Sequence, residues 1–200
     1  MGFAIGTLLN LGFVAVEAIY GVLSNSVSLL ADAGHNFSDV IGLLMAWGAY
    51  LLARRRPSPA FTFGFGKSSI LAALFNALLL LVAIGGLCWE AAQRLWHPEP
   101  VATGTVMIVA AAGIAINGLT AWLFASGRKG DLNVQGAFLH MLADAAVSAG
   151  VVVAAFVMSR TGWLWVDPAV SLAVNAVILW GTWGLLRQSV AMAMAGVPDG

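Results

Sequence analysis

The sequence predicts an all-α membrane protein with six transmembrane helices and both chain ends on the cytoplasmic side. Two observations predict this class: an unusually apolar composition, and six long apolar stretches separated by polar or turn-forming residues. Of the 200 residues, 60% are hydrophobic and 9% are charged. Soluble domains have about 25% charged residues, so these few charges could not cover a soluble globule of this size. Nine basic and nine acidic residues give no net charge, which argues against a nucleic-acid partner.

Each predicted element is a stretch of about 20 or more mainly apolar residues, the length that crosses the hydrocarbon core of a bilayer. The first stretch has no basic flank before it and no small-residue cleavage site after it, which predicts a retained helix rather than a signal peptide. In chain order the predicted spans are Gly2–Leu23, ended by the turn at 24–26; Val27–Ala53, ended by the basic segment 54–67; Ser69–Trp96, ended by His97 to Pro100; Val101–Ala125, ended by the polar segment 126–131; Val134–Ser159, ended by 160–165; and Val166–Ser189.

The distribution of Lys and Arg predicts the orientation. Cytoplasmic loops of membrane proteins are enriched in these residues. Seven of the nine lie in segments 54–67 and 126–131 or near the C-terminal end, whereas only Arg94 and Arg160 lie on the other side. We therefore expect a multi-pass membrane protein with both ends in the cytoplasm.

Two of the predicted spans carry the same pattern, His-x-x-x-Asp. His35 and Asp39 lie on the second span, and His140 and Asp144 lie on the fifth. Residues i and i+4 share one helix face, so each pair can direct one nitrogen and one oxygen at the same point. One such pair can be a hydrogen-bonded couple. Two identical pairs on antiparallel spans, each roughly 15–18 Å from a membrane face at 1.5 Å per residue, favour one shared site.

The chemistry of these four side chains suits a transition-metal ion. Two imidazole nitrogens and two carboxylate oxygens match a tetrahedral Zn²⁺ site and also accept Cd²⁺, Co²⁺ or Ni²⁺, whereas Mg²⁺ and Ca²⁺ prefer oxygen alone. Two ionised aspartates carry a charge of −2, which one divalent cation or two protons would neutralise. Since metal ligands must be deprotonated, the site predicts exchange of a metal ion for protons.

Two further carboxyl groups lie inside the predicted spans. Asp32 precedes His35 by about one helical turn, and Glu17 lies in the outer half of the first span. Asp32 is either a solvated carboxylate at the helix entry, favoured there by the helix dipole, or part of the outer access path. Glu17 either lines that path, takes part in proton movement, or pairs with a polar neighbour.

At these residues the chain resembles the cation diffusion facilitator family, in its bacterial zinc, cobalt and cadmium (zinc transporter) branch. The resemblance covers nearly the whole chain. The motifs that carry it are the run from Ser26 to His35 continuing to Asp39, Phe63 to Lys67, Leu139 to Asp144 with Ser148, Asp167 to Ser171, and Gly196 to Pro198.

The resemblance implies a membrane transporter rather than an enzyme, one that exports divalent metal, chiefly Zn²⁺, in exchange for protons and usually works as a homodimer. The family's metal-site motif falls on His35, Asp39, His140 and Asp144, and no organic cofactor is implied. Residues 1–190 correspond to the six-helix transport domain. Residues 191–200 correspond to a stub leading to a cytoplasmic domain that is absent here.

Two alternatives remain open from the residues. The chain could bind metal as a sensor or scaffold without moving it. It could also export organic cations coupled to protons, with Glu17 and tryptophans as the binding groups. An intramembrane metalloenzyme is disfavoured because the His-Glu-x-x-His pattern does not occur.

Overall fold

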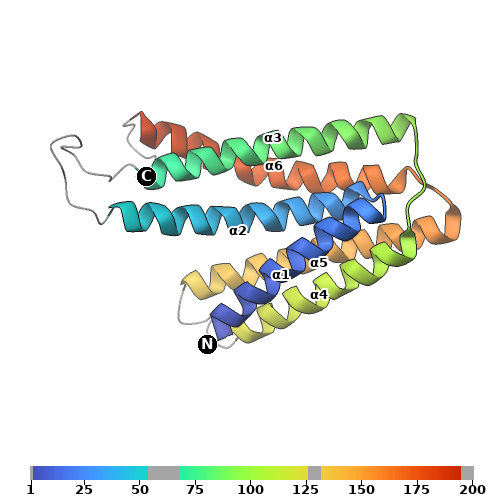
Figure 1. Ribbon diagram of the computed structural model, residues 1–200, viewed down its shortest axis with the longest axis horizontal. Helices are drawn as coiled ribbons and strands as arrows, with labels where there is room; N and C mark the ends of the chain where they lie inside the picture. The colour runs from blue at the N-terminus through green and yellow to red at the C-terminus, as the bar shows by residue number, and fades with distance from the viewer. Residues whose placement is uncertain (1, 54–67, 126–131, 195–200) are drawn as a thin grey trace.

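The protein is a bundle of six α-helices that run alternately in opposite directions (Figure 1). This computed structural model describes residues 2–53, 68–125 and 132–194, and within these ranges it contains no strand. The predicted all-α class is confirmed, and the helix ends differ from the predicted ones by at most four residues. The helices are α1 (Gly2–Leu23), α2 (Val27–Ala53), α3 (Ser68–Trp96), α4 (Thr103–Phe124), α5 (Leu132–Thr161) and α6 (Val166–Ala193).

Length and apolar composition identify the protein as an integral multi-pass membrane protein. Within the described residues, α3, α4, α6 and the Val134–Thr161 part of α5 are long and apolar enough to cross a bilayer, and Leu11–Leu23 is a shorter apolar segment. Large apolar side chains face outward, as shown by Trp180, which is 87% exposed. An outer surface of this kind suits contact with lipid. The structure therefore assigns four spans by composition, and the full count of six remains a proposal.

The arrangement of the helix ends agrees with an even number of crossings. Helix α1 begins and α6 ends at the same end of the bundle (Figure 1). The basic segments 54–67 and 126–131, which carried the orientation argument, lie outside the described residues, as do residues 195–200 of the expected C-terminal stub.

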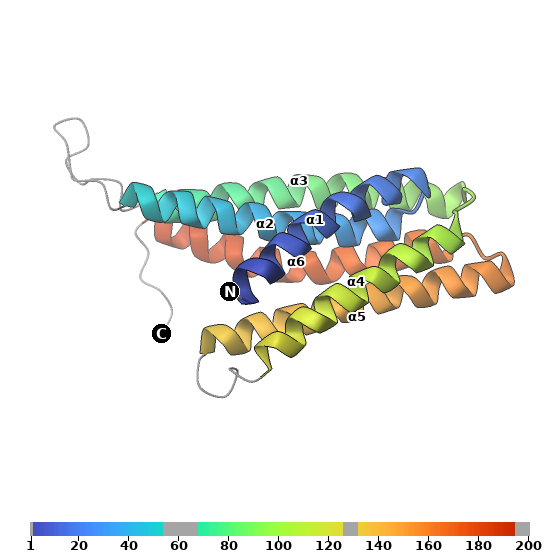
Figure 2. The ribbon, with the colours of Figure 1, turned by 60° about the horizontal axis from the view of Figure 1, so that its bottom comes forward.

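Helix α2 lies between two parts of the bundle. Helices α4 and α5 run side by side, and α3 packs against both α2 and α6 (Figures 1 and 2). Helix α1 contacts α2 and α4, and α2 also reaches α5. The residues of α2 can therefore meet side chains from several helices at once.

Two apolar clusters fill the interior. The larger joins α1, α2, α4 and α5, and the smaller joins α2, α3 and α6. In a bilayer these side chains would otherwise contact lipid, so the clusters stabilise the bundle through close van der Waals packing rather than through removal from water. The larger cluster consists of Phe13, Leu29, Val106, Val109, Ala110, Val151, Ala155 and Met158, and the smaller of Ala31, Ile84, Val174 and Ile178.

The close approach of α1 to α2 depends on Gly21. A Cβ atom at this position would lie 2.8 Å from Cδ2 and 2.9 Å from Cγ of Leu30, and 3.3 Å from its backbone nitrogen. We expect Gly21→Ala to lower the free energy of unfolding by about 1–3 kcal/mol, because α1 and α2 would have to separate. The measurement is thermal unfolding in detergent.

Gly12→Ala is the matched control on the same helix, because a Cβ there meets nothing within 4 Å. This variant should be neutral or more stable, since alanine favours a helix over glycine by about 1 kcal/mol. Equal stability of the two variants would contradict the close packing at Gly21.

Candidate metal site

The two His-x-x-x-Asp pairs lie opposite each other on α2 and α5. Nε2 of His140 is 3.2 Å from Oδ2 of Asp39 and 3.7 Å from Oδ2 of Asp144. Nε2 of His35 is 3.6 Å from Oδ1 of Asp144, and its Nδ1 is 3.8 Å from Oδ2 of Asp39. The imidazole rings are 6.0 Å apart and nearly perpendicular. We call these four alternating side chains the His–Asp ring.

The members of the His–Asp ring differ strongly in exposure. The side chain of Asp144 is 1% exposed, whereas that of His140 is 42% exposed. His35, Asp39 and Asp144 line a cavity of about 270 Å³ between α2, α3, α5 and α6, together with polar side chains such as Asn76. The ring is therefore accessible at His140 and buried at Asp144.

The hydrogen-bonding capacity of the ring is largely unused. Both oxygens of Asp144, Oδ2 of Asp39 and Nδ1 of His35 are buried without a hydrogen-bond partner. An ionised carboxylate without donors is costly in an apolar interior. The ring thus has the chemistry to attract a positively charged occupant.

The ring does not have the geometry of a formed metal centre as it stands. Among the described residues, no group of three or more His, Cys, Asp or Glu side chains is arranged to hold a metal ion. One reason is visible in His35, whose two nitrogens face two different carboxylates. Ligation would require His35 to direct one nitrogen at the centre of the ring.

Glu17 and Asp32 form a second acidic group, fully buried beside the ring. Asp32 accepts a hydrogen bond from Oγ of Ser148 (2.8 Å), and Glu17 accepts one from Nδ2 of Asn36 (3.1 Å). The other oxygen of each carboxyl group, Oε1 of Glu17 and Oδ1 of Asp32, has no hydrogen-bond partner. The solvated alternative for Asp32 is therefore wrong, because its fully buried side chain bonds to Ser148 of α5. Glu17 does pair with a polar neighbour, Asn36.

Asn36 and Ser148 donate hydrogen bonds to these carboxyl groups. Neither has a role predicted from the sequence, and Ser148 enters only as part of a family motif. A signal was present in the spacing. Asn36 follows Asp32 by four residues, and Ser148 follows Asp144 by four, so each shares a helix face with an acidic residue. Extending the i,i+4 pattern to neutral polar residues would have found both.

The Ser148 hydroxyl should matter for stability because it donates to a buried carboxyl group. We expect Ser148→Ala to lower the free energy of unfolding by about 1–3 kcal/mol, the cost of leaving a buried acceptor without its donor. The measurement is unfolding in detergent against Ser159→Ala on the same helix, whose exposed hydroxyl bonds only to the backbone of Phe156. Equal losses in the two variants would contradict the assigned bond to Asp32.

Comparisons with known proteins cover nearly the whole chain. Residues 3–193 match the family described as the cation efflux transmembrane domain. The zinc transporter ZitB of Escherichia coli (strain K12) is 41% identical over 188 residues, which cover 94% of this chain and 60% of that protein. A cadmium, cobalt and zinc/H(+)-K(+) antiporter of Bacillus velezensis is 38% identical over 189 residues, covering 94% and 60% respectively.

A third relative, the cation efflux system protein CzcD of an Alcaligenes species (strain CT14), is 36% identical over 187 residues, covering 94% of this chain and 59% of that protein. All three names describe transport proteins rather than enzymes. The chain spans about three fifths of the length of these relatives.

Proposed function

The chain belongs to the cation efflux family, and from this premise we propose that it exports a divalent metal cation, with Zn²⁺ as the preferred cargo, in exchange for protons. Cd²⁺, Co²⁺ and Ni²⁺ are further candidate cargoes. The names of the relatives support metal transport, since they include zinc transporters and a cadmium, cobalt and zinc antiporter.

The His–Asp ring is the observation that carries the proposal. In a tetrahedral zinc site with bonds of about 2.0–2.1 Å, neighbouring ligand atoms lie about 3.3 Å apart. Two His–Asp separations across the ring, 3.2 Å between His140 Nε2 and Asp39 Oδ2 and 3.6 Å between His35 Nε2 and Asp144 Oδ1, are close to this value. Coordination by all four side chains would also require His35 to turn away from Asp39, which its Nδ1 faces at 3.8 Å.

Charge balance supports exchange with protons. The two aspartates of the ring carry −2 when ionised and the histidines are neutral, so a divalent ion or two protons would each remove the net charge. Because metal ligation needs deprotonated ligands, acidification must weaken metal binding. Entry of protons would therefore favour release of the metal.

The position of the ring supports alternating access. Its ligand pairs belong to different helices, α2 and α5, so relative movement of these helices would change the exposure of the site. We further propose six spans, both ends in the cytoplasm of a bacterial cell and a homodimer in the plasma membrane. Asp32 and Glu17 are proposed to line the access path or to carry protons.

Uptake of ⁶⁵Zn²⁺ into everted membrane vesicles under an imposed proton gradient tests the proposal. We expect the native protein to accumulate zinc and Asp144→Asn to lose at least ~100-fold of this activity, since a direct ligand should matter more than the outer-shell partners that cost 10–100-fold. The control is Ser159→Ala, which removes an exposed hydroxyl near the end of α5.

Native-like uptake by Asp144→Asn would show that the His–Asp ring is not the transport site. Zinc binding by the native protein without gradient-driven uptake would instead identify a sensor or scaffold.

A second comparison separates metal cargo from organic cargo. If the ring binds the metal, His140→Ala should abolish zinc binding measured by calorimetry in detergent, whereas Glu17→Gln should change the dissociation constant by less than about ten-fold because Glu17 is not part of the ring. Glu17→Gln keeps the size and the acceptor used by Asn36. A protein that transports organic cations would give the reverse ranking, with Glu17 essential and His140 dispensable.

A further inference from the structure

Asn76 is a polar side chain in the middle of α3. Between Ile70 and Leu87 every other residue of this helix is apolar or glycine. A polar side chain inside a span most simply forms a hydrogen bond to a neighbouring helix. Among the residues that the structure describes, none forms a hydrogen bond with the Asn76 amide. A contact between helices therefore does not account for it.

The Asn76 amide lies beside the His–Asp ring. Asn76 lines the cavity of about 270 Å³ that three members of the ring also line. Its Nδ2 lies 3.0 Å from the point that a Cβ atom at Gly42 would occupy, so the missing side chain at Gly42 makes room for the amide. Gly42 follows Asp39 by three residues in α2, or about 4.5 Å along the axis. The amide is therefore about one helical turn beyond Asp39.

The rest of the cavity wall that α3 and α6 contribute offers a cation little to bind. Thr182 is the other polar side chain of this wall, and its hydroxyl already donates to the backbone oxygen of Ile178 (2.8 Å). An amide both accepts and donates hydrogen bonds, so Asn76 is the group through which this wall can hold a polar occupant. The remaining α3 and α6 residues that line the cavity are Leu80, Val174, Val177, Ile178 and Gly181.

Asn76 lies on the accessible side of the ring. It is eight residues from the start of α3, and His140, the most exposed member of the ring, is eight residues from the start of α5. Both helices begin at the end of the bundle where α1 begins and α6 ends (Figure 1). A cation that arrives from that end would meet Asn76 and His140 before the buried Asp144.

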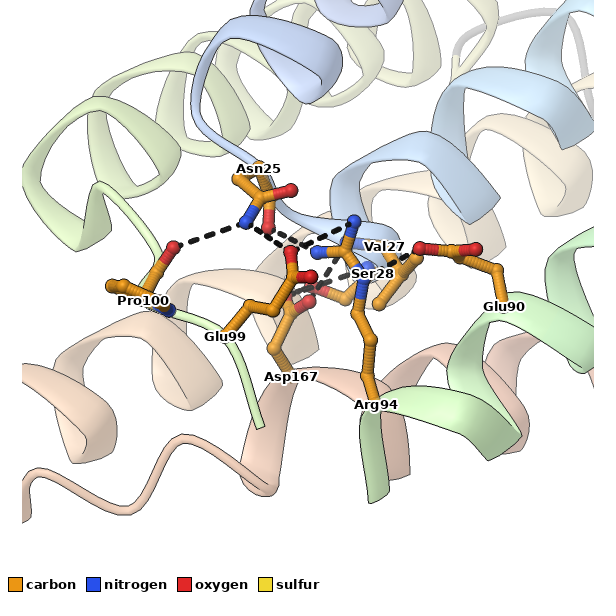
Figure 3. Close-up of polar contacts among 8 residues, drawn as sticks. All are labelled: Asn25, Val27, Ser28, Glu90, Arg94, Glu99, Pro100 and Asp167. Carbon is orange, nitrogen blue, oxygen red and sulfur yellow. Dashed lines mark hydrogen bonds and ion pairs between the residues drawn. The ribbon is translucent and has the colours of Figure 1, made fainter. Parts of the chain in front are cut away.

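The opposite end of the bundle is closed by contacts between helix ends (Figure 3). Nη1 of Arg94, near the end of α3, donates to the backbone oxygen of Asn25 (2.7 Å) in the turn before α2. Asp167, in the first turn of α6, accepts a hydrogen bond from the backbone nitrogen of Val27 (2.7 Å). The smaller apolar cluster fills the interior next to these contacts, since its Ala31 lies one helical turn before the ring residues of α2. The open approach to the ring is therefore on the side of Asn76.

The cavity is large enough for a cation that still carries water. A divalent ion with about six waters needs about 180 Å³, at about 30 Å³ of liquid volume per water. The cavity of about 270 Å³ exceeds this volume. Direct coordination by the ring would require the ion to lose most of that water. An amide that can bind the ion or its water suits the step in which water is exchanged for ligands.

We propose that Asn76 is a further cargo-binding residue, whose amide holds the incoming hydrated divalent cation beside the His–Asp ring and so sets the rate at which the ring is loaded. This inference rests on the proposed function. Asn76 acts before the four ligands and is not one of them. A neutral amide suits a brief contact, because it adds no charge that would retain the ion.

The test is the dependence of ⁶⁵Zn²⁺ uptake on zinc concentration, measured with the full chain in everted vesicles. Asn76→Leu keeps the approximate size of the side chain and removes its polar atoms. We expect the KM for zinc to rise about ten-fold, the scale of one lost hydrogen bond to a charged group, with a maximal rate within about two-fold of native. The zinc dissociation constant in detergent should stay within about three-fold of native, because loss of an entry site slows binding and release alike.

Asn76→Asp is the conservative variant. It keeps an oxygen that can bind the ion and adds a negative charge, so its KM for zinc should be at or below the native value. Thermal unfolding in detergent should show no loss of stability in Asn76→Leu, because the amide has no hydrogen bond to lose. A side chain that only holds helices together would give the opposite result.

A second pair of variants moves the amide without changing it. Gly42→Ala would place a Cβ atom 3.0 Å from Nδ2 of Asn76 and displace the amide, so it should raise the KM for zinc. Gly48→Ala is the matched control on α2, because a Cβ there meets nothing within 4 Å, and it should keep the native KM. Equal KM values for these two variants would contradict the proposal.

The outcomes distinguish this inference from the proposed function. If the native protein takes up no zinc, the proposed function fails. If the native protein transports and Asn76→Leu keeps the native KM, the loading role is wrong. A dissociation constant that rises in parallel with KM would make Asn76 a ligand of the final site, and a lower maximal rate with an unchanged KM would make it structural. Either result would also overturn the inference.

Discussion

The cost of burying carboxylates in an apolar helix bundle is the constraint on which the rest of the structure depends. Asp167 meets it fully, with hydroxyl and backbone donors around both oxygens. Asp144 does not, because neither of its oxygens has a hydrogen-bond partner. Glu17 and Asp32 are intermediate, each with one donor and one unpartnered oxygen. Buried polar groups normally have hydrogen-bond partners. A buried carboxylate with a full set of donors therefore joins helices, whereas one without donors is suited to an exchangeable cation.

Helix α2 organises these carboxylates because its polar contacts reach three neighbouring helices, α1, α5 and α6. Its first turn bonds to α6 through Asp167, Asp32 bonds to α5 through Ser148, and Asn36 bonds to α1 through Glu17. Apolar packing alone fixes helix rotation weakly in a membrane, where lipid is as apolar as a side chain. These directional bonds fix the rotation of α2 and thereby direct His35 and Asp39 towards α5.

The sequence alone was sufficient to predict the helices and the pairing of His with Asp within α2 and within α5. Apolar length and turn residues located all six helices to within a few residues, and the i,i+4 rule paired His35 with Asp39 and His140 with Asp144. It was insufficient for contacts that depend on helix rotation, such as Asn36 with Glu17 or Ser28 with Asp167.

The two kinds of carboxylate imply that one end of α2 is structural and that its middle binds an occupant. At the Asp167 end, neutral donors compensate the charge permanently, and nothing is gained by breaking the contact. At the ring, the histidines approach the carboxylates without hydrogen-bonding them, so the compensation is incomplete until a cation or protons arrive. An occupant entering past the half-exposed His140 would meet increasing burial towards Asp144. Exchange of that occupant requires the ring to change its exposure without dismantling α2, and the fully bonded first turn of α2 meets this requirement because it keeps the helix intact.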